Sequence, residues 1–128
     1  MTLVRETVLI VDDEEPIRQL ERRILEDQGY QVIEASNGLE GIELLAQGLP
    51  MDLVIADLDM PELGGDAMVQ RLLAIHPQMK VLYVTGKIGG LMNTRRLTDN
   101  EAFLEKPFGA VGLAEAVSQL LHDSLKER

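Results

Sequence analysis

Short apolar runs alternate with helix-like stretches along the chain, and this alternation constrains the fold more than any other feature. Five apolar runs stand at 8–11, 30–35, 53–56, 80–84 and 102–104. Apolar runs of this length, bounded by turn residues, are typical of buried strands. Apolar residues at helical spacing occupy 16–28, 39–47, 67–75 and 111–124. Between the last two strands, Gly86, Gly89 and Gly90 disfavour helix, so 91–98 is expected to form at most a short one.

Strands that alternate with helices form parallel sheets through right-handed crossovers, with helices on both faces. The continuous apolar character of the runs agrees with burial on both faces, and the polar residues of 30–35 favour an edge position. We therefore expect an α/β fold with a doubly wound, parallel, five-stranded sheet. In such sheets ligands bind beyond the carboxyl ends of the strands.

Composition narrows the class of protein further. The 128 residues suit one domain, which we expect to span 1–128. The absence of cysteine excludes disulfides and thiolate metal sites and favours a cytoplasmic location. No apolar run approaches the ~20 residues of a membrane span. The net charge of −10 disfavours direct binding to nucleic acid or to an anionic membrane.

Polar side chains stand where four of the apolar runs end. Asp12 and Asp13 follow the first run, Asp57 the third, Thr85 the fourth and Lys106 the fifth. Taken singly, Asp and Thr are common helix caps and turn residues. Three clustered carboxylates, however, repel one another unless a cation neutralises them. A hard divalent ion with oxygen ligands, such as Mg²⁺, fits an acidic cluster without His or Cys.

Motifs at these positions resemble the receiver domain of response regulators in two-component signalling, over essentially the full chain. The matching pieces are Asp12-Asp13-Glu14, Asp57 with Met60-Pro61 and Gly65, Thr85-Gly86, and Lys106-Pro107-Phe108. The segments 82–86 and 103–108 most resemble receivers attached to hybrid sensor histidine kinases. The resemblance implies a flavodoxin-like (βα)5 fold with strand order 2-1-3-4-5.

The resemblance also implies roles for the acids. Asp57 would be the phosphoacceptor, taking a phosphoryl group from the phosphohistidine of a histidine kinase or a histidine phosphotransfer protein. Mg²⁺ would be held directly by Asp13, Asp57 and the backbone carbonyl of Asp59, and largely through water by Asp12. The domain would catalyse only its own phosphorylation and dephosphorylation, so it is not an enzyme in the usual sense.

Three further residues are implied in the response to phosphorylation. Lys106 would pair with a phosphoryl oxygen, and with Asp57 beforehand, and the Lys106-Pro107 bond is usually cis in this family. Thr85 and Phe103 would form the switch, the hydroxyl moving toward the phosphoryl group and the ring filling the space it leaves. The output face, made by the fourth helix, fifth strand and last helix, would then meet an unknown downstream protein or fused domain.

Two positions near the implied site have no settled role. Asp59 and Lys87 carry opposite charges and flank the pocket mouth in this family, so they either pair across the entrance or remain two solvated side chains. A pair would restrict the water that hydrolyses the acyl phosphate. The glycine-rich segment 86–90 predicts a mobile fourth helix.

Two other classes of protein remain open. A haloacid-dehalogenase-like phosphatase would use Asp57 as its nucleophile, and Asp57-Leu58-Asp59 fits its Asp-x-Asp motif, although Met60-Pro61 follows and the chain is short for that fold. A flavodoxin-like FMN module shares the topology. The acidic residues 12–15 would repel a flavin phosphate.

Overall fold

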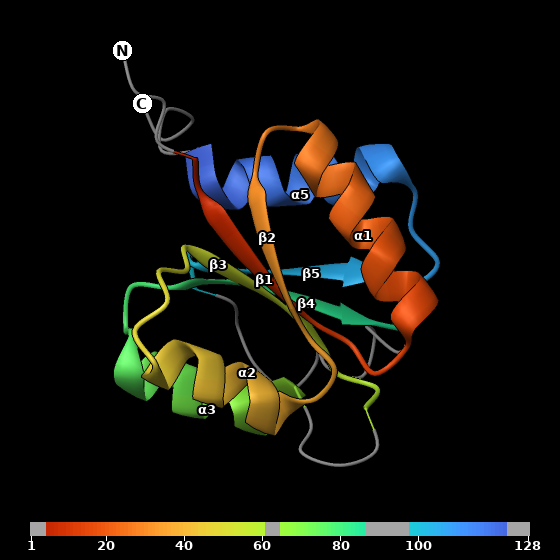
Figure 1. Cartoon of the computed structure of the whole chain (residues 1–128). Helices are drawn as coiled ribbons and strands as arrows, with labels where there is room; N and C mark the ends of the chain where they lie inside the picture. The colour runs from red at the N-terminus through yellow and green to blue at the C-terminus, as the bar shows by residue number, and fades with distance from the viewer. Residues whose placement is uncertain (1–4, 61–64, 87–97, 123–128) are drawn as a thin grey trace.

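The computed structural model describes residues 5–60, 65–86 and 98–122 (Figure 1). Strands and helices alternate within these ranges as the sequence predicts, except that the described residues contain no helix between the last two strands. The strands are β1 (Thr7–Val11), β2 (Gln31–Ala35), β3 (Leu53–Asp57), β4 (Lys80–Thr85) and β5 (Glu101–Glu105). The helices are α1 (Glu15–Asp27), α2 (Gly38–Ala46), α3 (Gly65–Ile75) and α5 (Ala110–His122). Within these ranges no helix is both long and apolar enough to cross a membrane.

All five strands are parallel and lie in the order β2-β1-β3-β4-β5, which confirms the expected topology. The register pairs Val8 with both Val32 and Leu53, and it pairs Tyr83 with Phe103 across β4 and β5. β2 lies at one edge, as its polar residues indicate. Because the strands run the same way, their carboxyl ends meet at one edge of the sheet.

Helices cover both faces of the sheet, with α1 and α5 on one side and α2 and α3 on the other (Figure 1). Successive residues of a strand point to opposite faces. Val8 and Ile10 of β1 accordingly join the core beneath α1 and α5, whereas Leu9 and Val11 join the core beneath α2 and α3. Every residue of β1 and β3 is buried, which explains why these runs are continuously apolar.

Local signals account for several element boundaries. Pro16 lies in the first turn of α1, where its missing N–H costs nothing. Asn37 caps α2, its side-chain oxygen accepting from Glu40 N at 2.8 Å. Gly29 and Gly48 follow helices at φ values of 95° and 88°, where a residue with a Cβ would be strained.

Some expectations concern residues that the structure does not describe. The short helix at 91–98, the glycine-rich segment from Gly86 onward and the side chain of Lys87 lie wholly or mostly outside the described ranges. The last helix is predicted to end at 124, which also lies outside the described ranges. The described part of α5 runs from Ala110 to His122. These predictions stay untested.

Candidate functional site

Residues from four strand ends come together at the carboxyl edge of the sheet. Asp57 and Thr85 are the last residues of β3 and β4, whereas Asp12 and Lys106 follow β1 and β5 directly. Backbone bonds just beyond the strands hold these positions, since Leu58 N donates to Val84 O and Lys106 N donates to Thr85 O, both at 2.9 Å. The predicted site residues are thus neighbours in space.

Three carboxylates form a tight cluster there. Asp12, Asp13 and Asp57 each offer an oxygen within 4.8 Å of the others. Asp12 and Asp57 are buried and Asp13 is exposed. Burial, together with the nearby charge of Asp57, raises the pKa of Asp12 to about 6, although the N–H of Glu14 partly opposes this. An all-oxygen donor set with one side open to water fits a hard divalent cation, so this acidic pocket is able to bind a metal.

Lys106 supplies a positive charge beside the cluster. Its Nζ lies 3.0 Å from Asp57 Oδ1 and 3.5 Å from Asp59 Oδ2. Partial burial disfavours the ammonium, but the hydrogen bond and charge of Asp57, with the charges of Asp12 and Asp59, raise the pKa of Lys106 overall. The Lys106-Pro107 peptide bond is cis, as the resemblance implies.

The side chain of Asp59 faces the strand end of β4. Its Oδ1 accepts from Thr85 Oγ1 at 2.9 Å, and its Oδ2 accepts from Gly86 N at 3.0 Å. These two bonds and the charge of Lys106 outweigh burial and lower the pKa of Asp59. Lys87, the partner considered from the sequence, lies outside the described residues. Asp59 is therefore not simply a solvated side chain at the pocket mouth.

Phe103 packs against an aromatic neighbour rather than standing alone. Its ring centroid lies 5.1 Å from that of Tyr83, with the planes tilted by 31°. Tyr83 is buried, and its hydroxyl donates to Glu101 Oε2 at 3.0 Å. Thr85 lies two residues beyond Tyr83 on the same strand face, so the hydroxyl and the half-buried Phe103 ring border one side of the sheet.

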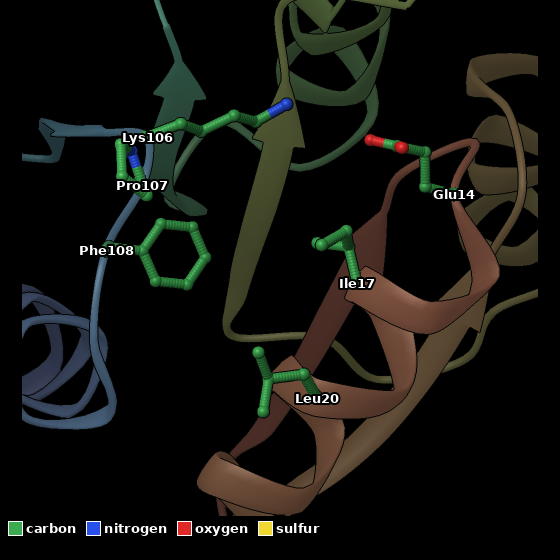
Figure 2. A pocket seen from close by; sticks show the side chains of 6 residues that line it. All are labelled: Glu14, Ile17, Leu20, Lys106, Pro107 and Phe108. Carbon is green, nitrogen blue, oxygen red and sulfur yellow. The ribbon is translucent and has the colours of Figure 1, made fainter.

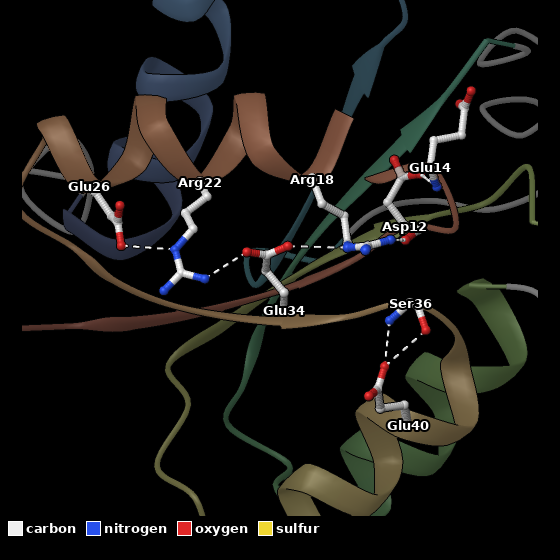
Figure 3. Close-up of polar contacts among 8 residues, drawn as sticks. All are labelled: Asp12, Glu14, Arg18, Arg22, Glu26, Glu34, Ser36 and Glu40. Atoms are coloured by element: carbon white, nitrogen blue, oxygen red, sulfur yellow. Dashed lines mark hydrogen bonds and ion pairs between the residues drawn. The ribbon is translucent and has the colours of Figure 1, made fainter. Parts of the chain in front are cut away.

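Arg18 of α1 ties the segment that carries Asp12 to β2, and Arg22 extends this ion-pair network along the helix (Figure 3). Arg18 donates through Nη1 to the Asp12 carbonyl at 2.7 Å and pairs through Nε with Glu34 of β2 at 3.2 Å. Arg22 bridges Glu34 and Glu26 at 2.6 and 3.0 Å. The polar residues of 30–35 indicate an edge strand, but they do not predict this network.

Glu21 of α1 is a second feature that is not among the residues predicted from the sequence. It is fully buried, and within the described part of the chain neither carboxylate oxygen has a hydrogen-bond partner. Burial is the main cause that raises its pKa to about 8, with the charges of Asp12 and Asp57 adding to it. Its position in the apolar stripe, between Leu20 and Ile24, was the available signal.

A groove runs from the site between α1 and the segment after β5 (Figure 2). Its volume is about 440 Å³. It is lined by Glu14, Ile17, Leu20, Lys106, Pro107 and Phe108. Figure 2 shows Lys106 and Glu14 at one end and the apolar side chains below them, so the groove joins an apolar surface to the charged rim.

Comparisons with known proteins agree with this geometry. The family model of the response regulator receiver domain matches residues 8–118. The chain is 35% identical over 117 residues to the sensor kinase CckA of Brucella abortus, covering 90% of this chain and 12% of the kinase. It is 30% identical over 121 residues to sporulation initiation phosphotransferase F of Bacillus subtilis, covering 93% and 96%. It thus spans about an eighth of that kinase but nearly all of the phosphotransferase.

Solved structures give the same result. The receiver domain of the hybrid histidine kinase CckA superposes with a TM-score of 0.77 at 29% identity, covering 91% of this chain and 99% of that one. A CheY-like receiver domain protein from Methanospirillum hungatei gives 0.81 at 26% identity, covering 98% and 100%. The phosphatase and flavin alternatives gain no support from these matches. The chain belongs to the response-regulator receiver domains of two-component signalling.

Proposed function

We propose that residues 1–128 form a single receiver domain that works as a phosphorylation-dependent switch, accepting a phosphoryl group on Asp57 in a Mg²⁺-dependent reaction. The observation that carries this proposal is the position of Asp57 between opposite charges. Its carboxylate lies in an acidic cluster with Asp12 and Asp13, while the Lys106 ammonium approaches Oδ1 to 3.0 Å. A buried acid in this setting combines a nucleophile with groups that stabilise added negative charge.

In the proposed reaction, a carboxylate oxygen of Asp57 attacks the phosphorus of a phosphohistidine. An acyl phosphate bond forms, the phosphorus–nitrogen bond breaks, and the imidazole leaves with that electron pair. Lys106 offsets the charge on the phosphoryl oxygens. Asp13, Asp57 and the Asp59 carbonyl would hold Mg²⁺ directly, and Asp12 largely through water. When bound, the ion would neutralise the charge that otherwise separates the carboxylate from the phosphoryl group.

Thr85 and Phe103 are the proposed switch. The Thr85 hydroxyl would turn toward the phosphoryl group, and the half-buried ring of Phe103 would move into the space beside β4. The output face would comprise β5 and α5 together with the segment 87–97, which lies outside the described residues. It would act on a downstream protein or fused domain rather than on nucleic acid, because the net charge is −10. Hydrolysis or back-transfer would end the signal, and no external substrate is turned over.

The donor is proposed to be a histidine kinase or a histidine phosphotransfer protein, docked along the groove beside Lys106. Ile17, Leu20 and Phe108 line that groove, and Leu20 is 49% exposed. A donor that delivers phosphohistidine to Asp57 would bury these side chains beneath an apolar helix surface. We expect Leu20→Asn to slow transfer from the protein donor while leaving phosphorylation by acetyl phosphate unchanged. Equal slowing with both donors would contradict this docking.

Labelling tests the function itself. Wild type and Asp57→Asn are incubated with a small phosphodonor, with Mg²⁺ and with EDTA, and acyl phosphate is measured. Asp66→Asn, which changes an exposed acid of α3, is the matched control. We expect stoichiometric labelling only of wild type and Asp66→Asn, and only with Mg²⁺. Equal labelling of Asp57→Asn would reject the proposal.

A further inference from the structure

The Asp59 carboxylate gathers three donors at the rim beside Asp57. Thr85 Oγ1 and Gly86 N donate to its two oxygens at 2.9 and 3.0 Å. The Lys106 ammonium lies 3.5 Å from the second oxygen while it also pairs with Asp57. A hydroxyl, a backbone amide and an amine thus converge on one anion next to the proposed phosphoacceptor.

A phosphoryl group on Asp57 would need the same kind of environment. Its oxygens carry negative charge that must be met by donors close to the reacting carboxylate. The donors proposed for that task are the Thr85 hydroxyl and the Lys106 ammonium, and both already engage Asp59. Two anions cannot hold one set of donors without repelling each other.

We propose that Asp59 is an internal competitor of the phosphoryl group. In the unphosphorylated protein its carboxylate binds the Thr85 hydroxyl and the Lys106 ammonium, and it must release both before they can bind the phosphoryl group. This inference rests on the proposed function. The exchange breaks no covalent bond. The bonds from Thr85 and Lys106 pass from one anion to the other, and the Asp59 carboxylate turns to water. Its side chain is 36% exposed, which leaves it a path outward.

Burial of Thr85 explains why a competitor is useful. The residue is 1% exposed, and a buried hydroxyl requires an acceptor at all times. Asp59 supplies one before phosphorylation and so holds the hydroxyl at the rim. The opposing explanation is that Asp59 only caps the end of β4 through Gly86. A cap would contribute stability, but its removal would not strengthen the binding of a phosphoryl group.

Beryllofluoride, an analogue of a phosphoryl group on a carboxylate, separates these explanations. Its affinity in the presence of Mg²⁺ is measured by fluorine NMR for wild type, Asp59→Ala and Asp59→Asn. Glu43→Ala, an exposed acid of α2, controls for the change in net charge. We expect Asp59→Ala to bind at least about tenfold more tightly, the equilibrium effect of one charge-assisted hydrogen bond. Asp59→Asn keeps a hydrogen-bond acceptor without the charge, so its affinity for beryllofluoride should lie between those of wild type and Asp59→Ala.

A double-mutant cycle identifies the contested donor. If Asp59 competes through Thr85, the gain in beryllofluoride affinity from Asp59→Ala shrinks in the Thr85→Ala background.

An unchanged or weaker affinity for beryllofluoride in both Asp59 variants, with Glu43→Ala like wild type, would overturn the inference. If Asp59→Ala does not fold, Asp59→Asn decides by the same criterion. Failure of wild type to label at Asp57 would instead reject the proposed function, so the two failures are distinguishable.

Discussion

Lys106 Nζ lies 3.0 Å from Asp57 Oδ1, and the two residues reach each other from strands that are not neighbours in the sheet. The pair offsets part of the repulsion between Asp57 and the other acids of the cluster. It also leaves a cation in place for the charge that a phosphoryl group brings. The contact therefore links the stability of the unphosphorylated site to its proposed chemistry.

Replacing this cation should slow the reaction. We expect Lys106→Met to lower the initial rate of phosphorylation by a small phosphodonor by roughly 100-fold, the typical effect of removing one donor to developing charge. Lys80→Met is the matched control, because Lys80 pairs with Asn100 at the amino end of β4. Rates are measured by acyl phosphate accumulation. A rate within about twofold of wild type would show that Lys106 does not contribute to the phosphorylation rate.

Gly65 leaves no room for a side chain beneath the site. A Cβ there would lie 2.6 Å from the Asp57 carbonyl oxygen, so backbone would have to shift. We expect Gly65→Ala to lower the free energy of unfolding by about 1–3 kcal/mol, measured by urea titration. Gly112→Ala in α5 meets only Leu104 at 3.9 Å and should stabilise by about 0.5–1 kcal/mol. Equal effects of both changes would contradict the close approach.

The buried Glu21 should make stability depend on pH. Its pKa is raised from 4.5 to about 8, so between these values the folded state holds a proton that the unfolded chain releases. The free energy of unfolding contributed by this group therefore falls as pH rises from about 4.5 to 8, by at most about 5 kcal/mol at about 1.4 kcal/mol per pKa unit. We expect Glu21→Leu to stabilise the protein much more at pH 8 than at pH 5.5.

Glu21→Gln separates charge from polarity. Glutamine does not titrate, so this variant should lose the Glu21 contribution to the pH dependence while keeping an unpartnered polar group in the core. Urea titrations at pH 5.5 and pH 8 compare it with wild type and Glu21→Leu. A difference between wild type and either variant that is the same at both pH values would show that Glu21 does not titrate in this range.

The Thr85 hydroxyl should couple phosphorylation to a movement of the Phe103 ring, which packs against Tyr83. With beryllofluoride and Mg²⁺ bound, we expect chemical-shift changes at the Phe103 ring in wild type and in Thr85→Ser, which keeps the hydroxyl. Thr85→Ala should bind the analogue with a much smaller change at Phe103, because no hydroxyl moves. NMR of the aromatic protons measures this directly. Identical shifts in Thr85→Ala and wild type would separate the ring from the proposed switch.

Most of the fold and the residues at the strand ends were predictable, because strands that are buried on both faces have a recognisable run of apolar residues in the sequence. Residues 53–56 of β3 and 81–84 of β4 are continuously apolar, and parallel strands bring their carboxyl ends to one edge. The sequence therefore predicts that Asp12, Asp57 and Thr85 lie close together. Their proposed roles came from the resemblance to a family, not from the pattern.

Other contacts depend on side-chain directions that periodicity does not specify. Asp59 lies beyond the end of β3, where the chain has left the strand, so its turn toward Thr85 was not predictable from spacing. Glu21 is a good helix former by propensity. Its burial follows from the docking of α1 on the sheet, a tertiary effect that overrides local preference.

Borohydride trapping is the sharpest test of the proposed phosphoacceptor, because it identifies the modified residue rather than the amount of label. Hydride reduces an aspartyl phosphate to homoserine, with release of phosphate. Wild type is phosphorylated in Mg²⁺, reduced, digested and sequenced by mass spectrometry. We expect homoserine at position 57 and at no other acid, and none without the phosphodonor. Homoserine at Asp12, Asp13 or Asp59, or incorporated phosphate without homoserine at 57, would contradict the proposal.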